Sequence, residues 1–174
     1  GSVRGVEEPA PHLYEAEALL GRKLVTVQDV EQGARDLIAM GVPAVLVKGG
    51  HTFSDESTSS NGDDETMSSS LSYAQDYFLS SEDASEEPRL CDGNRGVWLR
   101  SPRYDTEHTH GTGCTLSSAI ASALALGEQQ RELQDTTHQQ GATSAIYPID
   151  ACCLAKAYVT AGIYTGVQSR LLYT

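Results

Sequence analysis

Residues 107–120 constrain this chain more than any other stretch, and they read EHTHGTGCTLSSAI. Gly111 and Gly113 lead directly into a run of small residues that favours a helix. The first turn of a helix carries several backbone N–H groups without an intrahelical acceptor, at the positive end of the helix dipole. Glycine has no Cβ, so it lets the backbone approach a ligand and adopt φ values that other residues resist. The pattern predicts a site for an anion, most often a phosphate. The alternative is a glycine turn that caps an ordinary buried helix.

Cys114 is expected at the N-terminus of this helix, where the dipole stabilises a thiolate. The alternative for Cys114 is a buried structural cysteine. The helix should pack through one apolar face, and Gly127 is expected to end it. That face comprises Leu116, Ala119, Ile120, Ala123 and Leu124.

Helix and strand patterns alternate along the rest of the chain. Residues 11–20 have helical spacing, Thr26 and Asp29 match a capping box, and the helix that follows is expected to stop at Gly41. Residues 44–47 are continuously apolar, as in a strand of a parallel sheet that is covered on both faces. The alternation predicts an α/β fold.

Two further short strands are expected at residues 76–79 and 97–100, joined as a hairpin, and a last helix at residues 150–168. The last helix should pack through Cys153, Leu154, Ala157, Ala161 and neighbouring residues. Residues 52–75 and 80–96 are predicted to be polar insertions. Residues 128–148 are rich in Gln and Thr and are predicted to form a loose connection.

The net charge of −12 is concentrated in one segment, because residues 51–92 hold eleven Asp or Glu and one Arg. This serine-rich segment predicts a solvated insertion. The alternative is a regulatory or partner-binding arm. No basic stripe with interleaved aromatic residues is present, which argues against nucleic-acid binding.

At 174 residues the chain suits a single domain. Its four cysteines fit neither a zinc cage nor a dense disulfide framework. No run of about 20 apolar residues occurs, so a cytoplasmic protein without a membrane segment is expected. Assembly into a homo-oligomer is left open.

Residues 110–127, HGTGCTLSSAIASALALG, resemble the signature of the hydroxymethylpyrimidine phosphate kinases, the thiamin-pathway branch of the ribokinase-like superfamily. Most of the superfamily has Gly-Ala-Gly-Asp at this place, and a cysteine marks the pyrimidine and pyridoxal kinase branch. Residues 41–51 (GVPAVLVKGGH), 11–20 (PHLYEAEALL) and 155–158 (AKAY) resemble other segments of the family in the same order.

The resemblance implies the C-terminal part of a ribokinase-like three-layer α/β/α fold with a mainly parallel sheet. It also implies ATP, Mg²⁺, and phosphorylation of hydroxymethylpyrimidine or its monophosphate in thiamin synthesis. An N-terminal half or a second chain would then complete the fold and the pyrimidine pocket. The alternatives are a pyridoxal-type kinase of the same superfamily and a non-catalytic remnant or interaction protein.

The resemblance also implies roles for individual residues. Cys114 would be the catalytic base, and Lys48 would face the transferred phosphate. Nucleotide contacts would come from Gly111, Thr112, Gly113, Lys48 and Lys156. Each role has a plainer alternative, because Lys48 suits a turn at the surface and Lys156 suits a solvated helix face.

Glu15 matches the glutamate of the superfamily's Asn-x-x-Glu element, which organises magnesium. His12 stands where the family has asparagine, and histidine is a poorer partner for Mg²⁺ than a carboxamide oxygen. Glu15 would otherwise be an ordinary glutamate in the first turn of a helix.

Overall fold

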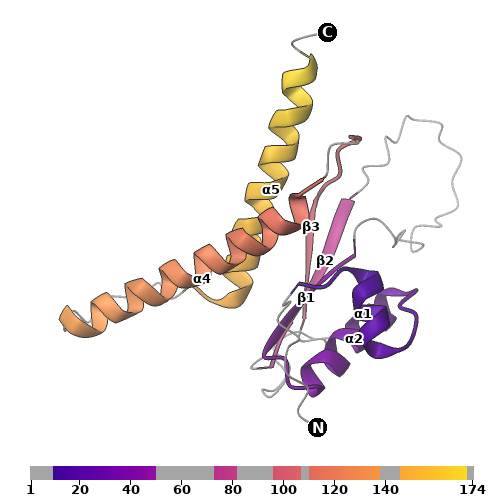
Figure 1. Cartoon of the computed structure of the whole chain (residues 1–174), viewed down its shortest axis with the longest axis horizontal. Helices are drawn as coiled ribbons and strands as arrows, with labels where there is room; N and C mark the ends of the chain where they lie inside the picture. Colours follow the sequence, from indigo (N-terminus) through magenta and orange to yellow (C-terminus); the bar gives the residue numbers. More distant parts are fainter. Residues whose placement is uncertain (1–9, 50–72, 82–95, 107–109, 138–145, 172–174) are drawn as a thin grey trace, which may run out of the picture. The chain divides into compact units, whose positions relative to one another are not determined.

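The structure is a computed structural model that describes residues 10–49, 73–81, 96–106, 110–137 and 146–171 (Figure 1). The chain divides into two compact units, Gly1–Arg103 and Tyr104–Thr174. The first unit holds helices α1 (Leu13–Leu20) and α2 (Val27–Ala39) and a three-stranded sheet, and the second holds helices α4 and α5. A single domain over the whole chain therefore stays a prediction.

The sheet consists of β1 (Ala44–Lys48), β2 (Tyr73–Ser80) and β3 (Val97–Pro102), in the order β1-β2-β3. Both described strand pairs are antiparallel, so the predicted mainly parallel sheet is not confirmed in the described part of the chain. Val45, Leu46 and Val47 are each at most 2% exposed, and successive residues of a strand point to opposite faces. β1 is thus covered on both faces, as predicted, but such burial does not specify the direction of the neighbouring strand.

Helices α1 and α2 cover one face of the sheet (Figure 1). Alternate residues of β1 and β2 face these helices. Buried side chains from the sheet, from both helices and from the segment between them form one apolar core, which comprises Ala16, Leu24, Val30, Ala34, Leu37, Val45, Val47, Tyr77 and Leu79. Trp98 packs against this core, with its ring centroid 5.0 Å from that of Tyr77, and its Nε1 donates to Oε1 of Glu31 at 2.9 Å.

The predicted start and end of α2 are confirmed. The Asp29 N–H donates to Oγ1 of Thr26 at 3.1 Å, and the Thr26 N–H donates to Oδ2 of Asp29 at 2.8 Å. This reciprocal pair satisfies two of the N–H groups that a helix leaves open at its start. The helix ends before Gly41, whose φ of 101° lies in the left-handed region that glycine adopts readily.

The hairpin of β2 and β3 is confirmed, but β2 is longer than predicted. Tyr73, Ala74 and Gln75 pair with Pro102, Ser101 and Arg100, so the end of the predicted insertion at 52–75 belongs to the strand. β2 begins before the predicted strand at 76–79 because the last residues of β3 offer backbone pairing partners to these three residues. Ser80 likewise ends β2 rather than beginning the second predicted insertion. Residues 50–72 and 82–95, which hold the rest of both insertions, lie outside the described residues.

In the second unit, α4 (Thr112–Thr137) and α5 (Pro148–Leu171) pack against each other. Gly127 does not end α4, and residues 128–137 are helical, so the predicted loose connection at 128–148 is wrong for that stretch. A single glycine costs a helix only about 1 kcal/mol, and the Glu, Gln, Arg and Leu residues that follow favour a helix. A Cβ on Gly127 would lie 2.9 Å from Cβ of Ile146. Close packing beside the start of α5, rather than helix termination, therefore accounts for this glycine.

Burial along α5 differs from the prediction. Cys152 is 4% exposed and packs as a small apolar residue, whereas the predicted packing residues Cys153, Leu154, Ala157 and Ala161 are all exposed. None of the helices in the described part of the chain combines the length and apolar character needed to span a membrane.

Candidate functional site

The start of α4 is fixed by Gly111. Its carbonyl accepts hydrogen bonds from the Thr115 N–H at 3.0 Å and from Oγ1 of Thr115 at 2.9 Å. Its φ of 81° confirms the left-handed conformation expected of a glycine there. Thr112, Gly113 and Cys114 form the first turn, where backbone N–H groups point out of the helix at the positive end of its dipole.

Gly113 differs from Gly111. It is the second residue of α4 and is not one of the described glycines with positive φ, so the expectation of an unusual backbone conformation there is wrong. A residue inside the first turn takes ordinary helical angles. What Gly113 retains is the missing Cβ, which keeps the surface of this turn low.

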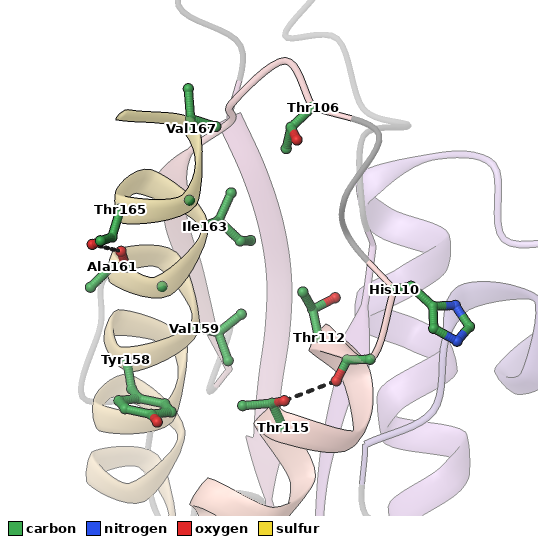
Figure 2. A pocket seen from close by; sticks show the side chains of 13 residues that line it. Thr106, His110, Thr112, Thr115, Tyr158, Val159, Ala161, Ile163, Thr165 and Val167 are labelled. Carbon is green, nitrogen blue, oxygen red and sulfur yellow. Dashed lines mark hydrogen bonds between the residues drawn. The ribbon is translucent and has the colours of Figure 1, made fainter. Parts of the chain in front are cut away.

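A pocket of about 620 Å³ lies between the start of α4 and the C-terminal half of α5, within the second unit. Its wall on the side of α4 includes Gly111, Thr112 and Thr115, and Thr106 borders it. Figure 2 shows Val159 and Ile163 of α5 directed across the hollow toward Thr112, and the side chain of His110 directed away from α5. The volume falls within the range of about 300–1,000 Å³ that is typical of small-molecule sites.

The wall formed by α5 has two rows of residues at one-turn spacing. Val159, Ile163 and Val167 form an apolar row, and Gly162 and Gly166 lie beside it. A Cβ added to either glycine would meet no atom within 4 Å, so both positions open onto free space. The pocket thus combines an apolar surface that suits a flat ring with hydroxyl groups and a helix N-terminus that suit an anion.

The predicted nucleotide-binding residues are only partly brought together. Gly111 and Thr112 line the pocket, whereas Gly113, Cys114 and Lys156 are not among its lining residues. Cys114 is a free thiol on the surface of the first turn of α4. Lys156 lies on α5 about half a turn before Tyr158, the first lining residue of that helix. The lining residues of α5 carried no sequence signal beyond a helical pattern.

Lys48 and Glu15 belong to the first unit, where they lie near each other. The Lys48 N–H donates to the carbonyl of Pro11 at 2.9 Å, and Lys48 forms an isolated parallel bridge with His12. His12 precedes α1, and Glu15 lies in the first turn of that helix. The end of β1 therefore adjoins the start of α1. Because Lys48 and Cys114 lie in different compact units, a common site for them stays a prediction.

Glu15 performs a local structural task. Its Oε2 accepts the His12 N–H at 2.6 Å, as expected of a glutamate in the first turn of a helix. The imidazole of His12 stacks on Tyr14, with ring centroids 5.5 Å apart. No three His, Cys, Asp or Glu side chains gather as a metal-binding group among the described residues. Mg²⁺ binding through Glu15 therefore remains a prediction.

Asp76 is a candidate residue that the sequence did not reveal. It is the register partner of Lys48 on the neighbouring strand and is 8% exposed, which makes it one of two buried polar residues in the described chain. The sequence placed it at the edge of a short strand. No sequence signal could have paired it with Lys48, because the register between β1 and β2 comes from the three-dimensional structure.

The helices beside a sheet and a glycine-initiated helix beside a pocket define an α/β protein of the ribokinase-like class, as predicted. The Bacillus subtilis pyridoxal kinase, solved as an ADP complex, is similar with a TM-score of 0.54 and 27% identity, over 87% of this chain and 40% of that one. The Staphylococcus aureus pyridoxal kinase in complex with AMP-PCP shares the fold, with a TM-score of 0.55 and 22% identity over 86% of this chain and 38% of that one.

The family of phosphomethylpyrimidine kinases matches residues 9–169, and this chain belongs to that family. The hydroxymethylpyrimidine/phosphomethylpyrimidine kinase of Haemophilus influenzae is 36% identical over 118 residues, which are 68% of this chain and 35% of that protein. The chloroplastic thiamine biosynthetic bifunctional enzyme of Arabidopsis thaliana is 40% identical over 118 residues, 67% of this chain and 17% of that protein. The match thus spans about a third of the length of the bacterial relative.

Proposed function

We propose that this chain carries the nucleotide-binding and catalytic part of an ATP-dependent kinase for hydroxymethylpyrimidine or its monophosphate, in thiamin biosynthesis. The observation that carries the proposal is the pocket that adjoins Gly111 and Thr112 at the start of α4. The phosphates of ATP would lie against the first turn of α4. The adenine ring would lie on the apolar row of α5.

Family membership supports this assignment, because the matched family and the Haemophilus influenzae relative are both named as pyrimidine kinases. The name of the Arabidopsis thaliana relative refers to thiamine biosynthesis. The match covers only a fraction of these proteins, so the acceptor pocket would be completed by an N-terminal half or by a second chain.

Cys114 is proposed as the general base. Its thiolate would take the proton of the acceptor hydroxyl, whose oxygen forms a bond to the γ-phosphorus while the bond to the β–γ bridging oxygen breaks and ADP leaves. A general base contributes about 10²–10⁴-fold. The backbone N–H groups of residues 111–114 would stabilise the charge on the transferring group, since phosphoryl transfer depends mainly on positioning and electrostatics.

Lys48 is proposed to face the transferred phosphate, and Lys156 to contact the nucleotide from α5. Mg²⁺ would neutralise charge on the phosphates when it is bound. It commonly keeps several waters and takes only one or two protein carboxylates. Such a site would fit Glu15 as its one carboxylate, with Oε2 also accepting the N–H of His12.

A pyridoxal-type kinase is the second candidate, because pyridoxal kinases are among the similar solved structures and one shares 27% identity with this chain. A non-catalytic protein that only retains the fold is the third. A measurement of nucleotide binding distinguishes the two kinase candidates from a non-catalytic protein that no longer binds nucleotide. Phosphorylation of hydroxymethylpyrimidine rather than pyridoxal, by the completed domain, separates the first two.

The test adds bulk to the wall of the pocket that α5 forms. Gly162→Leu would fill space that is open in the pocket, and Ala157→Leu would place the same side chain at an exposed position of α5 that does not line it. Titration with ADP should give binding that Gly162→Leu abolishes and Ala157→Leu retains. Equal binding by both variants would remove this pocket from the nucleotide site.

A further inference from the structure

We propose that the pocket beside α5 recognises a nucleobase by its flat shape and not by the hydrogen-bonding groups on its edge. Inosine triphosphate (ITP) should then bind about as well as ATP, and the class of phosphoryl donor would be purine nucleoside triphosphates in general. This inference rests on the proposed function, because it places the base of a nucleotide on the wall that α5 forms.

The wall formed by α5 has the shape of a shallow trough. At 3.6 residues per turn, Gly162 and Gly166 lie between the apolar row on one side and Tyr158 on the other. Neither glycine has a side chain, and a Cβ on either would meet no atom within 4 Å. A planar ring can therefore lie over the two glycines and contact the apolar row along its length.

The hydrogen-bond donors of this wall are already used within the helix. Residues 158–167 lie inside α5, so each of their N–H groups donates to the carbonyl four residues earlier. The hydroxyl of Thr165 donates to the carbonyl of Ala161 at 2.8 Å, and Figure 2 shows both residues on the side of α5 away from Thr112. The wall thus presents carbon atoms, rather than polar groups, to a ring that lies on it.

The residue types that distinguish one base from another are missing from the described lining of the pocket. Asn, Gln, Asp, Glu, Lys and Arg each pair with particular groups on base edges, and none of them is among the described lining residues. The lining hydroxyls belong to Thr and Tyr, and a hydroxyl can rotate to donate to a carbonyl or to accept from an amino group. The imidazole of His110 is directed away from α5 (Figure 2).

A comparison of ATP with ITP isolates the contribution of the base edge. The two nucleotides share the ring system, the ribose and the phosphates, but the amino group of adenine is replaced by a carbonyl and the neighbouring ring nitrogen changes from acceptor to donor. A site that hydrogen-bonds a group rejects an analogue without it by about 10⁴–10⁵-fold, whereas a pocket that recognises shape discriminates far less. The described lining therefore predicts similar affinities for both nucleotides.

The experiment titrates the full chain with the magnesium complexes of ATP, ITP and tripolyphosphate, which has no base. The Kd values of ATP and ITP should lie within about fivefold of each other, and both nucleotides should bind more tightly than tripolyphosphate. Tyr158→Phe removes a hydroxyl from the border of the trough and should leave the ratio of the two Kd values unchanged. Ile163→Ala removes apolar contact area and should weaken both nucleotides by the same factor, about tenfold, without affecting tripolyphosphate.

Leu154→Ala is the matched control, because Leu154 is an exposed apolar residue of α5 that is not among the lining residues. It should leave all three affinities unchanged, and thermal unfolding should confirm that every variant is folded. ATP binding with ITP more than about fivefold weaker would overturn this inference alone. So would an Ile163→Ala variant that loses affinity for ATP only, or for neither nucleotide. If the unaltered chain bound neither nucleotide, the proposed function would fail and this inference with it.

Discussion

Thr115 donates two hydrogen bonds to one acceptor, the carbonyl oxygen of Gly111, through its backbone N–H at 3.0 Å and its hydroxyl at 2.9 Å. These bonds fix the turn that precedes α4. Gly111 itself has a φ of 81°, in the left-handed region that glycine adopts readily. The path of the chain into α4 therefore passes through a conformation that suits a residue without a side chain.

Replacing Gly111 by alanine should destabilise the chain by roughly 1–3 kcal/mol, the usual cost of holding a non-glycine residue in a sparsely populated backbone region. A Cβ there would meet no atom within 4 Å, so the cost would come from the backbone alone. Urea unfolding of both proteins measures it. Gly162→Ala is the control, because Gly162 is helical and should gain stability from alanine. If the two substitutions had the same effect, the backbone conformation of Gly111 would not be required.

ATP should protect Cys114 from alkylation, because this thiol lies on the first turn of α4 between Thr112 and Thr115, which both line the pocket. Mass spectrometry after treatment with iodoacetamide reports each cysteine separately. Cys153 on α5 is the internal control. Although its surface is exposed, partial desolvation of the thiol by neighbouring atoms and the nearby charge of Asp150 raise its pKa, so it should react slowly with or without ATP. Protection of both cysteines, or of neither, would argue against phosphates bound at the start of α4.

The ion pair between Arg22 and Asp36 in the first unit should be sensitive to acid. Arg22 Nη2 donates to Oδ2 of Asp36 at 2.7 Å. This hydrogen bond is the main cause that lowers the pKa of Asp36, and burial opposes it. A carboxyl group with a lowered pKa stabilises the fold above its ordinary pKa, and this stabilisation is lost as the pH falls through the lowered value.

Asp36→Asn should therefore reduce the thermal midpoint by a few degrees at most at pH 7, as both side chains are more than a third exposed. At a pH below the lowered pKa of Asp36, the substitution should change the thermal midpoint little. Arg22→Met removes the other partner and should change the thermal midpoint with the same dependence on pH. A midpoint difference that stayed constant from pH 7 to the acid end would show that this contact does not contribute to acid sensitivity.

The sequence predicted those parts of the fold that depend on residues near one another along the chain. Thr26 and Asp29 specified the start of α2, and Gly111 specified the turn before α4. Contacts between distant segments were not predictable. In the sequence, Gly127 resembles the end of a helix, and only the structure shows Ile146 packed beside it. Asp76 likewise resembles any other strand residue in the sequence, and only the strand register shows that it lies opposite Lys48. The pocket wall of α5 was missed for the same reason.

Catalysis should depend on Cys114 once the domain is complete. This chain by itself is expected to show little or no kinase activity, because the acceptor pocket would lie mostly in the remaining part of the domain. When the chain is joined to an N-terminal half, the substitution Cys114→Ser should lower kcat far more than it changes ATP affinity. Serine preserves the size of the side chain but is a poorer base near neutral pH. An unchanged kcat in the active, joined protein would exclude Cys114 as the base.

Calorimetric titration with magnesium and a non-hydrolysable ATP analogue, for the original chain and for Gly113→Asp, tests the central claim most directly. Gly113 lies in the first turn of α4, where aspartate is compatible with the helix dipole but adds bulk and negative charge at the proposed phosphate position. We predict binding by the original chain and none by the folded Gly113→Asp variant. Equal heats from both proteins would contradict a nucleotide site at the start of α4.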